Sequence, residues 1–148
     1  MTHATQNTNG VRKVGIIILL EHNLASGIEF YKTLGMNMTF SLPDKWAEFE
    51  VGDVKIGLCP TEHEPFDRHT GIVFEVDNVQ ALYDAHKDTL SFVREPVEAV
   101  HGIMTSVKDP GGNIIDLYQP TPDRVKEMVE KMKNEEAQQQ EIKKEDIK

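Results

Sequence analysis

The sequence has few of the features that mark disulfide-bonded, nucleic-acid-binding or membrane proteins. Cysteine is nearly absent: Cys59 is the only one in 148 residues, so no internal disulfide can form. This favours a reducing compartment and a cytoplasmic location. Positive charge is also scarce, because 16 Lys and Arg stand against 25 Asp and Glu and leave a net charge of −9. Such a charge repels the phosphate groups of nucleic acids and anionic membranes, so we expect neither as a partner.

Long apolar runs are missing as well. The apolar run at residues 14–20 is much shorter than the roughly 18–20 residues that a membrane-spanning helix needs. Residues 1–10 are polar and lack the apolar core of a secretion signal, so we expect a disordered lead-in there. The rest of the chain has the length of one ordinary domain.

The same order of elements occurs twice, once in residues 11–60 and once in residues 69–120. Each repeat begins with an apolar stretch typical of a central strand, continues with apolar residues at helical spacing, and ends with short stretches typical of strands. We predict helices at about 24–34 and 77–89, and strands at 11–20, 36–41, 45–51, 54–59, 71–76, 91–95, 103–108 and 114–118. The prediction is therefore an α+β fold of two βαβββ repeats.

Capping residues mark the boundaries of the helices in both repeats. Asn23 is a typical N-cap residue for the first helix, and Gly35 is a typical stop after it. Asp77, with Gln80 three residues later, predicts a capping box for the second helix. Each predicted helix therefore has its own start signal.

A further helix is predicted after the repeats, at residues 121–134, where Thr121 and Pro122 form its start. We interpret its apolar row as a packing or dimer face; the row consists of Val125, Met128, Val129 and Met132. Residues 135–148 are charged and rich in Gln, and we predict a charged tail there.

The clearest hairpin lies at residues 103–120, where Asp-Pro-Gly-Gly at 109–112 has the composition of a tight turn. The strand after this turn alternates, so Asp116 and Tyr118 point to one face while Ile115 and Leu117 point to the other. A carboxylate is therefore placed between apolar neighbours on one face of a sheet.

Three motifs in the right order resemble the vicinal-oxygen-chelate superfamily, which includes glyoxalase I, bleomycin-resistance proteins, fosfomycin-resistance enzymes and extradiol dioxygenases. The motifs are EFYKTLGM at 29–36, GIVFEVDN at 71–78, and DPGGN at 109–113 followed by Asp116 and Leu-Tyr. The resemblance implies that each repeat forms a curled, mixed sheet and that two such sheets surround a cavity. It also implies a homodimer, because one-domain members build their cavities by pairing repeats across subunits.

Metal enzymes of this superfamily bind a divalent ion through side chains on four strands, and the resemblance places these positions at Ile16, Gly57, Gly71 and Asp116. Three of the four carry no donor atom, and metal sites in proteins need imidazole, carboxylate or thiolate donors. We therefore predict no metal and no other cofactor. The alternative is a divalent metal held by non-standard ligands among His22, His63, His69 and His101.

Several side chains are candidates for binding a small molecule. On the third strand Trp46, Glu48 and Glu50 alternate with apolar residues, so Trp46 would stack on a planar or cationic ligand and the glutamates would pair with its charge. The alternative is a solvent-facing strand with an isolated tryptophan. The resemblance adds His101 at the cavity rim, and the final hairpin adds Met104, Asp116 and Tyr118 as further ligand-binding candidates.

Three functions follow from these candidates. The first is a metal-free protein that binds a small, cationic or aromatic molecule in the cavity of a homodimer. The second is a metal-dependent lyase, isomerase or dioxygenase of the glyoxalase I type that uses non-standard ligands. The third is a metal-free enzyme with Glu48, Glu50 or Asp116 as general base. The missing metal donors favour the first, and catalysis stays open as an alternative.

Overall fold

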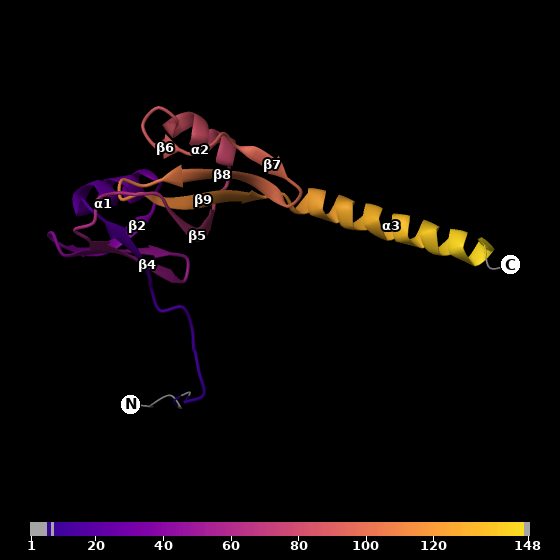
Figure 1. The fold of residues 1–148 in the computed structure, drawn as a ribbon, viewed down its shortest axis with the longest axis horizontal. Helices are drawn as coiled ribbons and strands as arrows, with labels where there is room; N and C mark the ends of the chain where they lie inside the picture. The colour runs from indigo at the N-terminus through magenta and orange to yellow at the C-terminus, as the bar shows by residue number, and fades with distance from the viewer. Residues whose placement is uncertain (1–5, 7, 147–148) are drawn as a thin grey trace. The chain divides into compact units, whose positions relative to one another are not determined.

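The computed structural model describes residue 6 and residues 8–146, without the side chain of residue 146 (Figure 1). Most of the lead-in predicted at residues 1–10 lies outside these residues. The described residues form nine strands and three helices, which confirms the predicted α+β fold. They divide into two compact units: unit 1 takes Met1–Phe66 with Pro110–Asn113, and unit 2 takes Asp67–Asp109 with Ile114–Lys148.

Unit 1 contains a mixed sheet and one helix. Its elements are β1 (Ile17–Glu21), α1 (Leu24–Thr33), β2 (Asn37–Leu42), β3 (Trp46–Val51) and β4 (Val54–Pro60). The strand order is β1-β4-β3-β2, with β1 parallel to β4 and the other neighbours antiparallel. The first βαβββ repeat is therefore present as predicted.

The helix α1 packs on one face of this sheet and forms the core of unit 1. The fully buried side chains of β3 and β4 alternate along the strands, and together with α1 they form a cluster of Phe30, Tyr31, Ala47, Phe49, Ile56 and Leu58. Burying a large apolar side chain stabilises a fold by about 1.5–3 kcal/mol. The opposite face of the same sheet is not covered by α1.

Unit 2 contains the second sheet and two helices. Its elements are β5 (Arg68–Glu75), α2 (Val79–His86), β6 (Ser91–Phe92), β7 (Val97–Ala99), β8 (Gly102–Lys108), β9 (Asn113–Pro120) and α3 (Pro122–Asp146). The strand order is β5-β9-β8-β6, and β7 also pairs with β8. The core on the α2 side includes the buried side chains of Val79, Val107, Ile115 and Leu117.

The strand predictions need three corrections. The first strand covers Ile17–Glu21 rather than residues 11–20, because its pairing with β4 begins only at Ile17↔Ile56. The strand predicted at 91–95 is reduced to Ser91–Phe92, where two residues pair with β8. The sequence prediction missed β7, a strand of three residues that is too short to show periodicity.

The helix predictions are partly confirmed. Asn23 caps α1, since its Oδ1 accepts a hydrogen bond from the Ser26 amide at 3.0 Å, and Gly35 follows with φ of 85°. The capping residue of α2 is Asn78 rather than Asp77: Asn78 Oδ1 accepts from the Ala81 amide at 2.9 Å. Both residue types are good caps, so composition did not separate them. The helix α2 also ends at His86, earlier than predicted.

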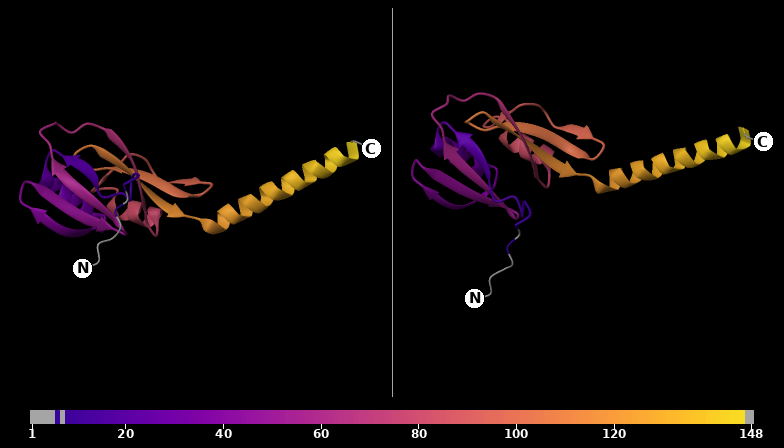
Figure 2. Two further views of the ribbon diagram at one scale, coloured as in Figure 1. Left: turned by 90° about the horizontal axis from the view of Figure 1, so that it is seen from below. Right: turned by 60° about the horizontal axis from the view of Figure 1, so that its bottom comes forward.

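The helix α3 continues to Asp146, so the prediction of a helix ending at 134 and a tail from 135 was wrong for the described part. Charged and Gln residues are good helix formers, and no Gly or Pro interrupts the chain after Pro122. Both views of Figure 2 show α3 as one uninterrupted helix. None of the described helices is both long enough and apolar enough to cross a membrane.

Candidate functional site

The uncovered face of the unit 1 sheet presents an apolar surface that also carries carboxylates. The strand register places Ile18 beside Gly57, Gly57 beside Glu48, and Glu48 beside Phe40, so these side chains form one row across all four strands. Ile18 and Phe40 are about half exposed, at 51% and 47%. This face is therefore open, and the sequence prediction missed Phe40, whose place depends on a bulge between Met38 and Phe40.

Trp46 lies over Gly57 on this open face. A Cβ atom added to Gly57 would overlap Cη2 and Cζ2 of the Trp46 ring and would lie 3.1 Å from Cδ1 of Ile16. The indole ring therefore occupies the space that a side chain at position 57 would need. The sequence prediction placed Trp46 on this face, but its contact with Gly57 could not be read from the pattern.

The glutamates of β3 are accessible to solvent. Glu48 is half-buried, and its Oε2 accepts a weak hydrogen bond from Thr39 Oγ1 at 3.4 Å. Glu50 is exposed and lies opposite Lys55 in the sheet register. Neither carboxylate is fully buried. Glu48 is the nearer of the two to Trp46, two residues away on the same face of β3, whereas Glu50 is four residues away.

The corresponding face of the unit 2 sheet holds the remaining ligand-binding candidates. Ser106 Oγ donates a hydrogen bond to Asp116 Oδ1 at 2.5 Å, and Met104 lies opposite Tyr118. Tyr118 Oη donates to the carbonyl oxygen of His101 at 2.8 Å, and the two rings lie 5.9 Å apart. His101, Met104, Asp116 and Tyr118 thus belong to one local cluster.

Ser106 was missed as a site residue. Its place depends on the hairpin register, in which five residues, 109–113, separate the paired Lys108 and Ile114 and Ser106 lies opposite Asp116. Counting outward from the turn predicted at 109–112 would have set Ser106 opposite Ile115 instead. Its hydroxyl donates a hydrogen bond to one of the two carboxylate oxygens of Asp116, and Ser106 is only 6% exposed. Asp116 is therefore held in a fixed orientation by a neutral neighbour.

The side chains present do not fit a metal of the superfamily type. Of the four implied positions, Ile16 and Gly57 lie in unit 1, and Gly71 and Asp116 lie in unit 2. Only Asp116 offers a donor atom. Among the described residues, no group of three or more His, Cys, Asp or Glu side chains is arranged to hold a metal ion.

The alternative histidine ligands are placed elsewhere. His22 Nδ1 donates to the carbonyl oxygen of His63 at 3.0 Å, and His22 Nε2 lies 3.8 Å from Glu64 Oε1, a pair in which Glu64 is largely exposed. His69 is exposed on β5, and His101 is exposed before β8. The contacts of His22 with His63 and Glu64 hold a surface loop near the end of β1. They do not bring donor atoms together around one point.

The motif at 109–113 has a structural role in unit 1. Asn113 Nδ2 donates to the Leu20 carbonyl at 2.9 Å and contacts Glu21 Oε1 at 3.4 Å. A Cβ atom on Gly111 would lie 2.5 Å from Glu21 Oε2 and 2.6 Å from the Leu20 carbonyl oxygen. Glu21 itself is fully buried. The motif therefore covers a buried carboxylate at the end of β1 and takes no part in the open faces.

The contact between Trp46 and Gly57 gives a first testable expectation. Gly57→Ala should lower the free energy of unfolding by about 1–3 kcal/mol, because the new methyl group must displace the indole ring. In a Trp46→Ala background the same change should cost at least about 1 kcal/mol less, as expected for coupled neighbours. Urea unfolding followed by circular dichroism measures all four proteins of the cycle.

The fluorescence of Trp46 and a control variant check whether the indole ring occupies the space beside Gly57. Trp46 is the only tryptophan, so its emission should move to longer wavelength in Gly57→Ala as the ring turns toward water. Gly15→Ala is the control, because nothing lies within 4 Å of a Cβ atom at Gly15. Equal losses from Gly57→Ala with and without Trp46 would show that the ring does not occupy this space.

A sequence model of one family matches residues 13–117 of the chain: the glyoxalase/bleomycin resistance protein/dioxygenase superfamily. This match covers both repeats and most of the chain, so the protein belongs to that superfamily. The helix α3 lies beyond the matched residues. A search among proteins of curated function found no relative.

Solved structures show the same fold. A bleomycin-binding protein from Streptomyces verticillus, solved with copper(II)-bleomycin, is 20% identical, with a TM-score of 0.54, covering 76% of this chain and all of that one. A fosfomycin resistance protein from Listeria monocytogenes is 14% identical, with a TM-score of 0.64, covering 78% and 96%. An antibiotic-binding protein from a Streptomyces species is 19% identical, with a TM-score of 0.59, covering 75% and 98%.

Proposed function

We propose that this protein binds a small, planar molecule that carries a positive charge, and that it does so without a metal ion. The observation that carries the proposal is the open face of unit 1, where Glu48 lies on the same face as Trp46, two residues further along β3, and Glu50 continues this row opposite Lys55. An aromatic face attracts cations and stacks on flat rings, and nearby carboxylates strengthen the attraction.

The absence of metal donors supports binding rather than metal chemistry. At Gly57 the chain has no donor, and the Trp46 ring and Ile16 fill the space that a donor side chain would need. The apolar side chains around Trp46 also suit a flat ligand, since small-molecule sites are mostly apolar with a few polar groups. We therefore assign this surface to recognition by contact and charge.

The relatives are consistent with such a role. Two solved structures of the same fold are described as a bleomycin-binding and an antibiotic-binding protein, so the fold serves binding in those proteins. We propose in addition that two copies of this chain form a homodimer and that the second copy helps to enclose the ligand. An open apolar surface of this kind is typical of a site that is completed by a partner.

Three small probes test the proposal by separating ring from charge. 1-Methylquinolinium is a planar cation, quinoline at neutral pH is a planar neutral molecule, and tetramethylammonium is a cation without a ring. We expect isothermal titration calorimetry to show the tightest binding for 1-methylquinolinium. Trp46→Ala should weaken this binding about tenfold, in line with a cation–π contribution of about 1–2 kcal/mol.

Charge variants provide matched controls for the same titrations. Glu48→Gln should weaken 1-methylquinolinium binding about threefold at low salt, and less as salt screens the charge. Glu50→Gln should weaken it less than Glu48→Gln, because Glu50 is four residues from Trp46 and lies opposite Lys55. Glu75→Gln removes an exposed glutamate of β5 in unit 2 and should leave binding unchanged. Equal binding of all three probes, or unchanged binding in Trp46→Ala, would contradict the proposal.

The metal-free part is tested separately. The purified protein is soaked in Ni²⁺, Zn²⁺, Mn²⁺ and Fe²⁺, passed through a desalting column, and analysed for metal content. We expect far less than one metal ion per chain. Near-stoichiometric metal would overturn the metal-free part and direct attention to His22, His63, His69 and His101 as ligands.

A further inference from the structure

The helix α3 is an element that the superfamily match leaves unexplained. It is 25 residues long and begins after residue 117, where the matched region ends. Among its described side chains only that of Val125 is partly buried, and the others are exposed. Its apolar side chains are therefore uncovered: Met128 is 40% exposed, Met132 56% and Ile142 59%.

The exposed side chains of α3 follow a heptad pattern. Apolar residues and one amide recur at alternating steps of three and four along one stripe, namely Val125, Met128, Met132, Gln139 and Ile142, with Glu135 as the exception. Stripes of this spacing form the seams of two-stranded coiled coils, in which a polar residue in the seam can set the register. Here two of the six layers, Glu135 and Gln139, are polar. The pattern points to another helix of the same kind as the partner.

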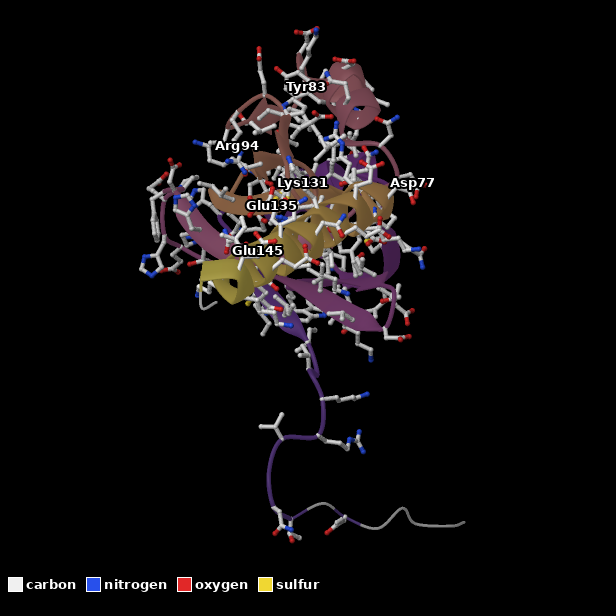
Figure 3. The ribbon with its side chains drawn as sticks, turned by 90° about the vertical axis from the view of Figure 1, so that its right-hand side faces the viewer. Asp77, Tyr83, Arg94, Lys131, Glu135 and Glu145 are labelled. Atoms are coloured by element: carbon white, nitrogen blue, oxygen red, sulfur yellow. The ribbon has the colours of Figure 1, made fainter. Side chains whose placement is uncertain are left out.

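Charges beside the stripe fit a second copy of α3. In a parallel pair, the residue just before one layer faces the residue five positions later in the other helix. Lys131 therefore faces Glu136 of the second copy, and the symmetry of the pair creates this contact twice. Figure 3 labels Lys131 on α3, together with Glu135, which is one of the polar layers of the stripe and precedes Glu136 in the chain.

The parallel direction matches the apolar layers better than the antiparallel one. In a parallel pair Val125, Met128 and Met132 each meet the same residue of the second copy, so three apolar layers form in succession. In an antiparallel pair aligned on Val125 and Ile142, Met128 would face Gln139 and Met132 would face Glu135. A parallel pair also sets Glu135 against Glu135 and Gln139 against Gln139, so its polar groups are confined to two layers. The antiparallel arrangement would bury the same polar groups against methionines in four layers, which costs free energy.

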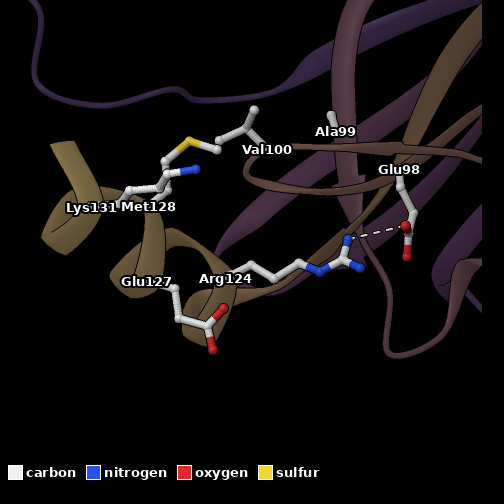
Figure 4. Close-up of a pocket in the computed structure, with 7 residues that line it drawn as sticks. All are labelled: Glu98, Ala99, Val100, Arg124, Glu127, Met128 and Lys131. Atoms are coloured by element: carbon white, nitrogen blue, oxygen red, sulfur yellow. Dashed lines mark ion pairs between the residues drawn. The ribbon is translucent and has the colours of Figure 1, made fainter. Parts of the chain in front are cut away.

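The first turn of α3 contacts unit 2 through an exposed ion pair. Arg124 Nη1 pairs with Glu98 Oε2 at 3.1 Å (Figure 4). The hollow beside this contact has a volume of about 430 Å³, and Val100 and Met128 are among its lining residues. Val100 is 53% exposed, so the apolar surface continues from α3 onto the turn after β7.

We propose that α3 is a self-association helix that pairs in parallel with α3 of a second copy of this chain. The seam consists of the stripe from Val125 to Ile142, and the paired charges of Lys131 and Glu136 select the partner. The residues of this seam are not those of the ligand surface on unit 1, and the pairing of α3 adds to the homodimer proposed above.

Charge reversal tests the partner and the direction together. Lys131→Glu should weaken dimerisation of the full chain about tenfold in sedimentation equilibrium, because two attractive pairs become repulsive. Glu136→Lys should do the same, and the double variant Lys131→Glu/Glu136→Lys should restore the affinity. Lys133→Glu makes the same change in net charge away from the stripe and should have a much smaller effect.

Disulfide trapping tests the register. In a Cys59→Ser background, Ile142→Cys should form an intermolecular disulfide under mild oxidation, since the same residues meet in a parallel pair. Glu141→Cys, which points away from the seam, should form far less. Far-ultraviolet circular dichroism confirms that each variant keeps its helix.

The outcomes separate this proposal from other forms of association. A monomer at all concentrations would overturn it, and so would a dimer whose affinity is unchanged in Lys131→Glu. A dimer that forms through another face would give that second result and no trapping at position 142. Trapping between Val125→Cys and Ile142→Cys chains, without trapping at 142 alone, would show an antiparallel pair and also overturn it.

Discussion

Gly112→Ala is expected to lower the free energy of unfolding by about 3 kcal/mol or more, which corresponds to a fall in Tm of about 6–12 °C for a chain of this size. Two effects add at this position. The φ of Gly112 is 92°, a left-handed conformation that costs an alanine about 1–2 kcal/mol. A Cβ atom there would also overlap the carbonyl oxygen of Phe66 and lie 2.7 Å from its carbonyl carbon, so the backbone itself must move.

Gly35→Ala separates the two effects. Gly35 has a similar φ of 85°, but nothing lies within 4 Å of a Cβ atom there. Only the conformational cost of about 1–2 kcal/mol should therefore appear. Thermal and urea unfolding of both variants provide the comparison. Equal losses at the two positions would show that the hairpin tip does not press on Phe66.

Glu21→Ala is expected to destabilise the protein by about 3 kcal/mol, within the range for truncating a buried side chain. Glu21 is fully buried, and its side chain lies 2.8 Å from a Cβ position on Gly27 and 2.5 Å from one on Gly111. Removing it leaves a cavity between these two glycines. It also removes the acceptor that lies 3.4 Å from Asn113 Nδ2.

Two variants check the reason for this loss. Glu21→Gln keeps the volume and one acceptor oxygen, so it should lose less than half as much stability as Glu21→Ala. Glu75→Ala truncates an exposed glutamate and should change the stability by less than about 0.5 kcal/mol. If Glu21→Ala were as mild as Glu75→Ala, the close packing of α1 and the hairpin tip on this carboxylate would be wrong.

The repeats could be predicted because their signals are local. Asn23 and Gly35 mark the ends of α1 through contacts within a few residues, and the alternation of Trp46 to Val51 shows which side chains share a face. Short elements and helix ends were less accessible. The strand β7 forms because Val97–Ala99 pairs with β8, and nothing within these three residues requires a strand.

The candidate site was predictable in its members but less so in their contacts. The alternation rule placed Trp46 and Glu48 on one face, and Met104 was a candidate on its hairpin before its pairing with Tyr118 was known. The sequence could not show that Trp46 covers Gly57, because that contact joins different strands through a side chain of specific orientation. Glu21 escaped notice because a single glutamate at the end of an apolar strand gives no sign of burial.

The four residues at the hairpin tip have a consequence for how the chain is made. Unit 1 contains Met1–Phe66 and Pro110–Asn113, and this second piece leaves the ribosome long after the first. A nascent chain that ends at Phe66 has no Asn113 to bond to Leu20 and no Gly111 to lie beside Glu21. The first repeat therefore lacks the contacts that cover Glu21 until the second has almost been translated.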